Sequence, residues 1–309
     1  MKKKLSEGHK MWLSVMTVFL IYATVFILFE DYDRKFLKPF DEASDWHLLL
    51  FSLLVMSGLG FLLFRYARRM DERISREQAE KENSLRRELT QNIAHELKTP
   101  TASILGYTET LTENPAMDEE TRRQFVRRTH SQAQRLTALL QDITTLNKMD
   151  YAPDRLRMER TDLSVLVADI VSETALAVRQ RGMELHNLLP QDIIVQGDAS
   201  LLYSIFRNLV DNAVSYAGSG TTIEISAARR GDSWLFTFRD NGIGIPAEHL
   251  PRIFERFYRI DKGRSRDMGG TGLGLSIVKN AVQLHGGHIS VSSPQGGGLV
   301  FEFTLPSKG

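Results

Sequence analysis

Hydrophobic residues form two long, almost uninterrupted runs near the N-terminus and periodic patterns in the rest of the chain. Met11–Phe29 contains no charged residue, and His47–Phe64 is nearly as apolar. A helix of either length crosses the hydrocarbon core of a bilayer. We therefore predict transmembrane helices over residues 11–29 and 47–65, joined by a short extracytoplasmic loop over residues 30–46.

The distribution of charge predicts the orientation of these two spans. Lysines precede the first run within residues 1–10, and Arg65, Arg68 and Arg69 follow the second, whereas the loop between the runs leans acidic. Lys and Arg are enriched on the cytoplasmic side. Both termini are therefore expected in the cytoplasm of a cell whose inner membrane the chain crosses twice. The alternatives are a cleaved signal peptide for the first run, disfavoured by its length, and a buried soluble hairpin.

A helical pattern follows. Residues 66–87 are charged and helix-prone, which predicts a helical linker. Leu85, Leu89, Ile93 and Leu97 then recur every four residues and form one apolar stripe. His95 lies two positions from Ile93 and Leu97, so it points roughly 160° away from each, toward solvent. Pro100 cannot donate to the carbonyl of Glu96, which predicts a kink. Taken alone, the pattern also fits an ordinary surface histidine.

A second helix is expected after the turn signal at residues 112–115. Its range is residues 118–148, with an inner stripe of Phe125, Ala133, Leu136, Leu140, Ile143 and Leu146. Two helices with one apolar face each cannot bury both faces alone. A homodimer that forms a four-helix bundle would bury them, so we predict a dimerisation domain over residues 88–152.

From residue 158 to residue 309 the pattern alternates between strands and helices, which predicts an α/β sandwich. Expected helices cover residues 163–179, 200–216 and a stretch from 273 to just before 286. Expected strands cover residues 183–189, 193–195, 222–227, 234–239, 288–292 and 299–305.

Three stretches of the predicted sandwich carry candidate chemistry. Asn208 and Asn212 share one helical face, where amide oxygens could hold Mg²⁺ together with phosphate oxygens; two surface asparagines are the alternative. Asp240 follows a strand, and its carboxylate can accept a hydrogen bond from an exocyclic amine such as that of adenine. Gly242 and Gly244 allow the backbone to approach a flat ring.

The third stretch, residues 269–275, is rich in glycine and opens a helix, where free N–H groups form an anion site. Between the second and third stretches, residues 253–259 resemble a mobile lid with aromatic anchors. Phosphate-seeking Arg and Lys residues follow within it and after it, at Arg259, Lys262, Arg264 and Arg266.

Composition removes several other functions. The chain contains no cysteine, which excludes disulfides, thiolate catalysis and cysteine-bound metal. Its net charge of +1 gives no field that would attract nucleic acid. Direct nucleic-acid binding is therefore not expected.

The motifs together resemble the membrane-bound sensor histidine kinases of two-component systems, with a HisKA-type dimerisation domain and a catalytic ATP-binding domain. Residues 95–100 (HELKTP) resemble the H box, Asn208–Asn212 the N box, residues 240–244 (DNGIG) the first glycine box, residues 254–258 the F box and residues 270–275 (GTGLGL) the second glycine box. The five motifs occur in the family's order. One departure is Ser215, where many members carry a phosphate-binding lysine, so Arg259 would carry more of that role.

The resemblance implies a mechanism and roles for individual residues. ATP would phosphorylate His95, and the phosphoryl group would pass to an aspartate in the receiver domain of a response regulator. Glu96 would be the acid–base partner of His95, and Thr99 would orient water in a phosphatase reaction. Asn212 would bind Mg²⁺ with support from Asn208, and Asp240 would bind adenine. The remaining nucleotide-binding residues implied by the resemblance are Tyr216, Gly242, Gly244, Arg259, Gly270, Thr271, Gly272, Leu273 and Gly274.

The resemblance also bears on the source of the signal and on the alternative functions. The linker at residues 66–87 is too short for the HAMP relay module common in this family, so we infer that HAMP is missing. Because the outer loop is too short for a folded sensor, the signal would come from the bilayer or from another membrane protein. The rivals are a kinase-inactive membrane scaffold or phosphatase, and a gyrase- or chaperone-type ATPase. The second rival carries a glutamate where this chain has Asn208.

Overall fold

The computed structural model describes residues 21, 23–32, 35, 46–151, 156–260, 270–295 and 297–307 of the 309-residue chain. The chain divides into two compact units, Met1–Arg87 and Glu88–Gly309. Lys262, Arg264, Arg266 and Gly269 lie outside the described residues.

The first unit is helical where it is described. Residues 23–32 form a helix, and helix α2 (Trp46–Glu113) begins in this unit. Leu53, Leu54 and Leu62 of α2 expose more than half of their surface. Within the described part of the chain, no helix combines the length and apolar character required to cross a membrane. Most of residues 11–29 and 30–46, the predicted first span and outer loop, lies outside the described residues.

In the second unit, the end of α2 and helix α3 (Glu119–Tyr151) form a hairpin. Asp118 begins α3 by accepting a hydrogen bond from the N–H of Thr121 at 2.9 Å, a typical helix cap. Tyr107 and Phe125 pack edge to face across the hairpin, with ring centroids 5.6 Å apart. Helix α2 continues through Pro100, where a kink was predicted.

In the predicted inner stripe of α3, Leu140 is 49% exposed in the single chain; the prediction has this stripe buried by a second copy of the hairpin. Leu146 of this stripe is buried, together with Leu139 and Met149, which the predicted stripe did not include. Helix α3 contacts two elements of the same chain: α2, at Phe125 and Arg135, and helix α7 (Gly274–Leu284) of the α/β domain. The sequence was interpreted for a single apolar face of α3, so its contact with α7 was not predicted.

The α/β domain contains a mixed five-stranded sheet in the order β2-β4-β5-β7-β6. Strand β2 is parallel to β4, and the other neighbours are antiparallel. The bounds are β2 Glu184–Leu188, β4 Thr222–Arg230, β5 Ser233–Asp240, β6 Ile289–Ser292 and β7 Val300–Pro306. A separate antiparallel pair joins β1 (Glu159–Asp162) to β3 (Ile194–Gly197).

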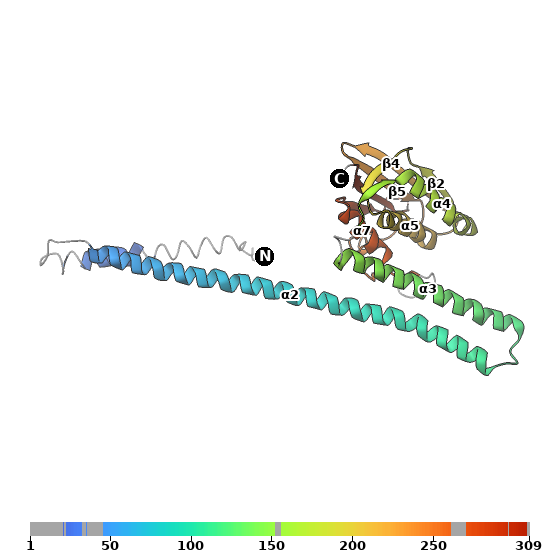
Figure 1. Ribbon diagram of the computed structural model, residues 1–309, viewed down its shortest axis with the longest axis horizontal. Coiled ribbons are helices and arrows are strands. Elements are labelled where there is room, and N and C mark those ends of the chain that lie inside the picture. The colour runs from blue at the N-terminus through green and yellow to red at the C-terminus, as the bar shows by residue number, and fades with distance from the viewer. Residues whose placement is uncertain are drawn as a thin grey trace. The chain divides into compact units, whose positions relative to one another are not determined.

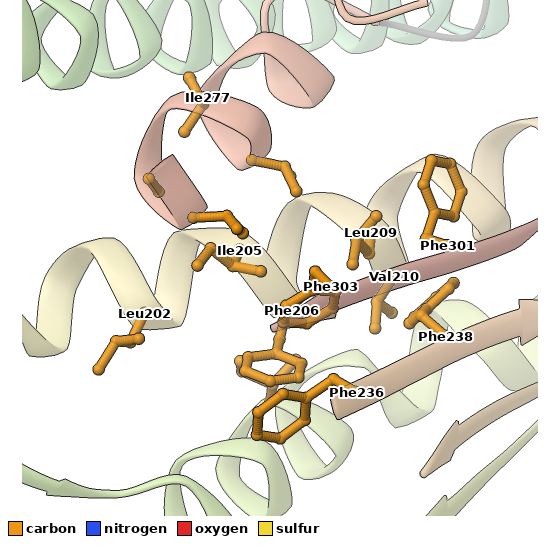
Figure 2. Close-up of a cluster of buried hydrophobic side chains, with 14 of the residues drawn as sticks. Leu202, Ile205, Phe206, Leu209, Val210, Phe236, Phe238, Ile277, Phe301 and Phe303 are labelled. Atoms are coloured by element: carbon orange, nitrogen blue, oxygen red, sulfur yellow. The ribbon is translucent and has the colours of Figure 1, made fainter. Parts of the chain in front are cut away.

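Three helices form the second layer: α4 (Leu163–Gln180), α5 (Ala199–Tyr216) and α7. Figure 1 shows them together on one side of the sheet. Figure 2 shows the core between the layers, where Phe206 of α5 meets Phe236 of β5 and Phe303 of β7, all fully buried. Alternate residues of β4, β5 and β7 face this core, while Glu224, Arg239 and Glu302 on the other face are exposed.

The predicted helical hairpin and α/β sandwich are confirmed. The α/β helices and the longer strands begin and end within a few residues of their expected positions. Strand β1 was not predicted because its sequence, ERTD, has no apolar alternation and is extended only through pairing with β3.

Candidate active site

The candidate site has two parts, and the first lies on α2. The side chain of His95 is exposed, as its position opposite the apolar stripe predicted. No hydrogen bond joins its imidazole to another residue of the described chain. One turn later the hydroxyl of Thr99 donates to the backbone oxygen of His95 at 3.3 Å. An imidazole placed in this way is open to a reactant from solvent.

The carboxylate of Glu96 is held by two arginines, whereas its expected role is that of acid–base partner of His95. Its Oε2 accepts hydrogen bonds from Nη2 of Arg135 on α3 at 3.1 Å and from Nη2 of Arg259 at 3.2 Å. The side chains are 16% exposed for Glu96, 8% for Arg135 and 6% for Arg259. The carboxylate therefore faces two guanidinium groups, while the neighbouring imidazole has none of these contacts.

The second part of the site lies in the α/β domain, around α5. Asn208 Nδ2 donates to the backbone oxygen of Ser204 at 2.8 Å, which orients its Oδ1 toward the start of α7. A Cβ on Gly274 would lie 2.5 Å from this oxygen, so any larger residue there would displace the amide of Asn208. Asn212 and Tyr216 follow at intervals of four residues and are half-buried. Amide oxygens on this face suit Mg²⁺ if phosphate oxygens complete its coordination.

Asp240 ends strand β5 and is 3% exposed. Its Oδ1 accepts a hydrogen bond from the N–H of Gly242 at 2.9 Å. Burial raises the pKa of Asp240, although the N–H groups around it oppose the shift. A Cβ on Gly242 would lie 2.3 Å from the backbone oxygen of Ala217, so this glycine allows the loop to close on α5.

The segment between the glycine boxes is joined to the second of them. Phe257 adopts a positive φ of 62°, and its N–H donates to the oxygen of Gly272 at 2.8 Å. Tyr258 bonds His249 at 2.7 Å, and Arg252 lies over its ring. Arg259 also donates to the backbone oxygen of Gly270. The F-box residues and the second glycine box are thus one connected lid.

Thr271 connects this lid to the hairpin. Its hydroxyl accepts from the N–H of Leu273 at 3.2 Å and donates to Asp142 Oδ2 on α3 at 2.6 Å. Burial raises the pKa of Asp142; the Thr271 hydroxyl opposes this shift, and the charge of Asp211 adds to it. A further ion pair joins Arg256 to Asp150 near the end of α3, at 2.8 Å.

Sequence reasoning missed Arg135, Asp142 and Asp150, which are the α3 residues in these contacts. A signal was present: Arg135, Leu139, Asp142, Leu146 and Met149 follow one another at intervals of three and four, so they share one helical face. Charged residues within a buried stripe indicate polar partners on the element that covers it.

The fold and these residues define a class of protein: an exposed histidine on a helical hairpin, followed by a nucleotide-type α/β sandwich. Two families match. Residues 85–152 match the His Kinase A (phospho-acceptor) domain, and residues 197–309 match the Histidine kinase-, DNA gyrase B-, and HSP90-like ATPase. The chain belongs to the sensor histidine kinases of two-component systems.

Individual proteins agree with this assignment. The sensor protein kinase WalK of Staphylococcus aureus is 34% identical over 223 residues, covering 72% of this chain and 54% of that sequence. Its counterpart from strain Newman is covered to 36%. The chain therefore spans about half or less of the length of these curated relatives.

Solved structures share the fold. Acinetobacter baumannii histidine kinase AdeS aligns with a TM-score of 0.56 at 23% identity, covering 69% of this chain and 98% of that one. Histidine kinase ThkA in complex with response regulator protein TrrA aligns with a TM-score of 0.56 at 22% identity, covering 71% and 61%. Full-length ShkA in complex with AMPPNP aligns with a TM-score of 0.52 at 25% identity, covering 69% and 44%.

Proposed function

We propose that this protein uses ATP and Mg²⁺ to phosphorylate His95 and then passes the phosphoryl group to an aspartate in the receiver domain of a response regulator. The observation that carries the proposal is the exposed imidazole of His95, within residues that match a phospho-acceptor domain and ahead of residues that match an ATPase domain. Two relatives with this fold were solved with AMPPNP and with a response regulator. We assign phosphotransfer to residues 88–152 and catalysis to residues 158–309.

The chemistry needs little covalent participation by the protein. One ring nitrogen of His95 attacks the γ-phosphorus, and the bond from that phosphorus to the ADP oxygen breaks. The other ring nitrogen keeps its proton, and Glu96 would accept a hydrogen bond from it and stabilise the developing imidazolium. Asn212, supported by Asn208, would hold Mg²⁺, which supplies positive charge for the phosphates. Asp240 would bind the adenine amine, with the glycine boxes and Tyr216 lining the nucleotide.

Labelling tests this function. The full chain with γ-³²P-ATP should gain an acid-labile, base-stable label, as expected for phosphohistidine, and should transfer it to one or a few receiver domains of the source organism. Release of free phosphate without a labelled protein would indicate a gyrase- or chaperone-type ATPase instead. Dephosphorylation of a phospho-regulator by an unlabelled protein would indicate a phosphatase or scaffold.

We further propose that the protein is a homodimer in the inner membrane, with both termini in the cytoplasm. Support for the membrane comes from the apolar runs at residues 11–29 and 47–65 and from the exposed Leu53, Leu54 and Leu62 of α2. Exposed Leu105, Val126 and Leu140 on the hairpin support a dimer interface. Input would then come from the bilayer or from a membrane partner.

The absence of cysteine makes this topology easy to test. Single cysteines introduced in the loop at residues 30–46 and near Gly309 should react differently with a membrane-impermeant maleimide on intact cells. Only the loop cysteine should be labelled. Labelling of the C-terminal cysteine, or recovery of the protein in the soluble fraction, would contradict the proposal.

A further inference from the structure

The ion pair between Glu96 and Arg135 lies within the helical hairpin, one residue from His95 along α2. Nη2 of Arg135 on α3 donates to Oε2 of Glu96 at 3.1 Å. The side chains are 8% exposed for Arg135 and 16% for Glu96. Arg259 reaches the same oxygen from the α/β domain, at 3.2 Å. Because Arg135 and Glu96 both belong to the hairpin, theirs is the contact that the hairpin itself provides.

This contact leaves one carboxylate oxygen of Glu96 for the imidazole. Both guanidinium groups bond Oε2, and Oε1 takes part in neither contact. In the proposed reaction, the ring nitrogen of His95 that keeps its proton donates to Glu96, and Oε1 is the oxygen left to accept this bond. Fixing Oε2 limits rotation of the carboxylate and therefore orients Oε1 before the reaction begins.

Stability alone does not account for a buried ion pair at this place. Both charges lose most of their hydration, and replacing such a pair by apolar residues of similar volume is often neutral or stabilising. An aliphatic side chain at position 135 would therefore fill the space between the helices at little cost. Arginine also remains protonated, so Arg135 is not an acceptor for the proton of the imidazole. Its guanidinium provides a fixed cation that holds the nearby carboxylate in one orientation.

We propose that Arg135 is a positioning residue for the phosphorylation of His95. It holds Glu96 so that Oε1 accepts the N–H of the imidazole while the other ring nitrogen attacks phosphorus. This inference rests on the proposed kinase function and adds a residue to its machinery. No atom is transferred to or from Arg135, which acts on His95 only through Glu96. The effect of substituting Arg135 therefore depends on whether the carboxylate of Glu96 is present.

Autophosphorylation of the full chain tests this role. Arg135→Gln removes the cation and should lower kcat about 10- to 100-fold, part of the 10²–10⁴ expected of an acid–base group. The KM for ATP should stay within twofold, because Arg135 acts on the histidine side of the reaction. Arg135→Lys keeps a charge and should recover kcat to within about fivefold of wild type, since the contact uses one nitrogen, Nη2. Arg128→Gln, at an exposed position two turns earlier on α3, is the matched control and should be neutral.

A Glu96→Gln background separates positioning from other roles of Arg135. There the carboxylate is gone, so adding Arg135→Gln should change the remaining rate less than twofold. Equal losses from Arg135→Gln in the two backgrounds would overturn the proposal, and so would a rise in KM for ATP as large as the fall in kcat. Either result would mean that Arg135 acts on the phosphates or on folding directly. Because this background leaves no unpaired buried carboxylate, the comparison remains possible even if Arg135→Gln alone does not fold.

The reactivity of His95 toward diethyl pyrocarbonate tests the contact without ATP. The reagent acylates a neutral imidazole, and a carboxylate that accepts the ring N–H makes the attacking nitrogen more nucleophilic. Acylation of His95, measured by peptide mass spectrometry relative to the exposed His130 of the same chain, should slow about threefold in Arg135→Gln and recover in Arg135→Lys. An unchanged ratio in Arg135→Gln would reject the proposal. Slower acylation in a chain that forms no phosphohistidine would instead reject the proposed kinase function, and with it the part of Arg135 in that reaction, while keeping its effect on Glu96.

Discussion

The hairpin and the α/β domain hold their candidate functional groups in opposite ways. On α2, His95, Glu96 and Thr99 come from little more than one helical turn, and the imidazole is exposed. In the α/β domain, Asp240 is buried, and residue 242 must be glycine because a side chain there would clash with the backbone of Ala217.

This difference means that substitutions in the two regions should affect different steps of the reaction. The reactivity of an exposed histidine on a continuous helix depends on the reactant that another domain or protein places beside it, because its own helix does little to enclose that reactant. The nucleotide-binding groups depend on packing, because they come from distant segments fixed by a shared core. Substitutions on the hairpin should therefore change transfer and spare nucleotide binding, while substitutions at the buried positions should change binding first.

The largest expected effect is at His95. His95→Gln removes the attacking nitrogen, so labelling from γ-³²P-ATP should be abolished. Nucleotide affinity, measured with a fluorescent ATP analogue, should stay within twofold, because the exposed imidazole of His95 makes no hydrogen bond or ion pair with the described residues of the α/β domain. His130→Gln, at an exposed position of α3, is the control. Labelling that persists in His95→Gln would reject the assignment.

The next largest effect is expected at Glu96. Glu96→Ala removes the group proposed to stabilise the imidazolium and should slow autophosphorylation by about 10²–10⁴ at saturating ATP. Affinity for the nucleotide analogue should be nearly unchanged. Glu109→Ala, at an exposed position on the same helix, should be neutral. A loss of affinity in Glu96→Ala as large as its loss of rate would contradict the separation of the two regions.

Asp240 should show the reverse pattern. Asp240→Asn replaces a charged acceptor by an amide and should weaken ATP binding about 10- to 100-fold, because a hydrogen bond to a charged group contributes about 1.5–3 kcal/mol. The rate at saturating ATP should fall much less than the affinity. Asp232→Asn in the β4–β5 turn is the control. Unchanged affinity in Asp240→Asn would remove this carboxylate from the nucleotide site.

A smaller and more selective effect is expected at Thr99. Thr99→Ala should keep autophosphorylation and lose most phosphatase activity on the phosphorylated regulator, about tenfold, because the hydroxyl is proposed to orient water. Thr101→Ala is a close control, since both hydroxyls donate to a backbone oxygen four residues earlier on α2. Equal rates of dephosphorylation in Thr99→Ala and wild type would remove Thr99 from that reaction.

The sequence predicted most of this arrangement where the information is local. The outward position of His95 follows from spacing along one helix, and the glycines at 242 and 274 lie in recognisable boxes. It did not predict which groups meet across elements. Arg135 and Asp142 resemble other charged residues of α3 in sequence, and their partners, Glu96 and Thr271, lie on other elements. The burial of Leu139 and Met149 was missed for the same reason, because the sequence of α3 was interpreted without its contact with α7.

Residue spacing also could not predict the hydrogen bonds of His285, at the end of α7. Its Nδ1 lies 2.7 Å from the oxygen of Ala281, and its Nε2 accepts from the N–H of Asp198 at 3.0 Å. One neutral tautomer satisfies both contacts, and protonation of Nε2 would break the second. Burial lowers the pKa of His285, although Ala281 and the charge of Asp198 oppose the shift.

This arrangement gives the smallest expected effect, a loss of stability at mildly acidic pH. Because the pKa of His285 is lower in the folded protein than the usual 6.5, the unfolded chain binds more protons between the two values. Its contribution to stability is complete above about pH 6.5 and declines as the pH falls below that value. Burial alone would raise the pKa of Asp198, but hydrogen bonds from Ser200, Lys148 and backbone N–H groups lower it to about 2. Its contribution is therefore lost only below about pH 4, outside the window of His285.

Trp234 in β5 provides a probe of this effect. In a background with Trp12→Phe and Trp46→Phe, its fluorescence should report a lower urea midpoint at pH 5.5 than at pH 7.5. His285→Gln should lower the urea midpoint at both pH values. It should also reduce the difference in midpoint between pH 5.5 and pH 7.5, since the amide does not titrate. His130→Gln should keep the full difference, because that imidazole is exposed. A pH dependence in His285→Gln as steep as in the parent background would show that acid acts elsewhere in the α/β domain.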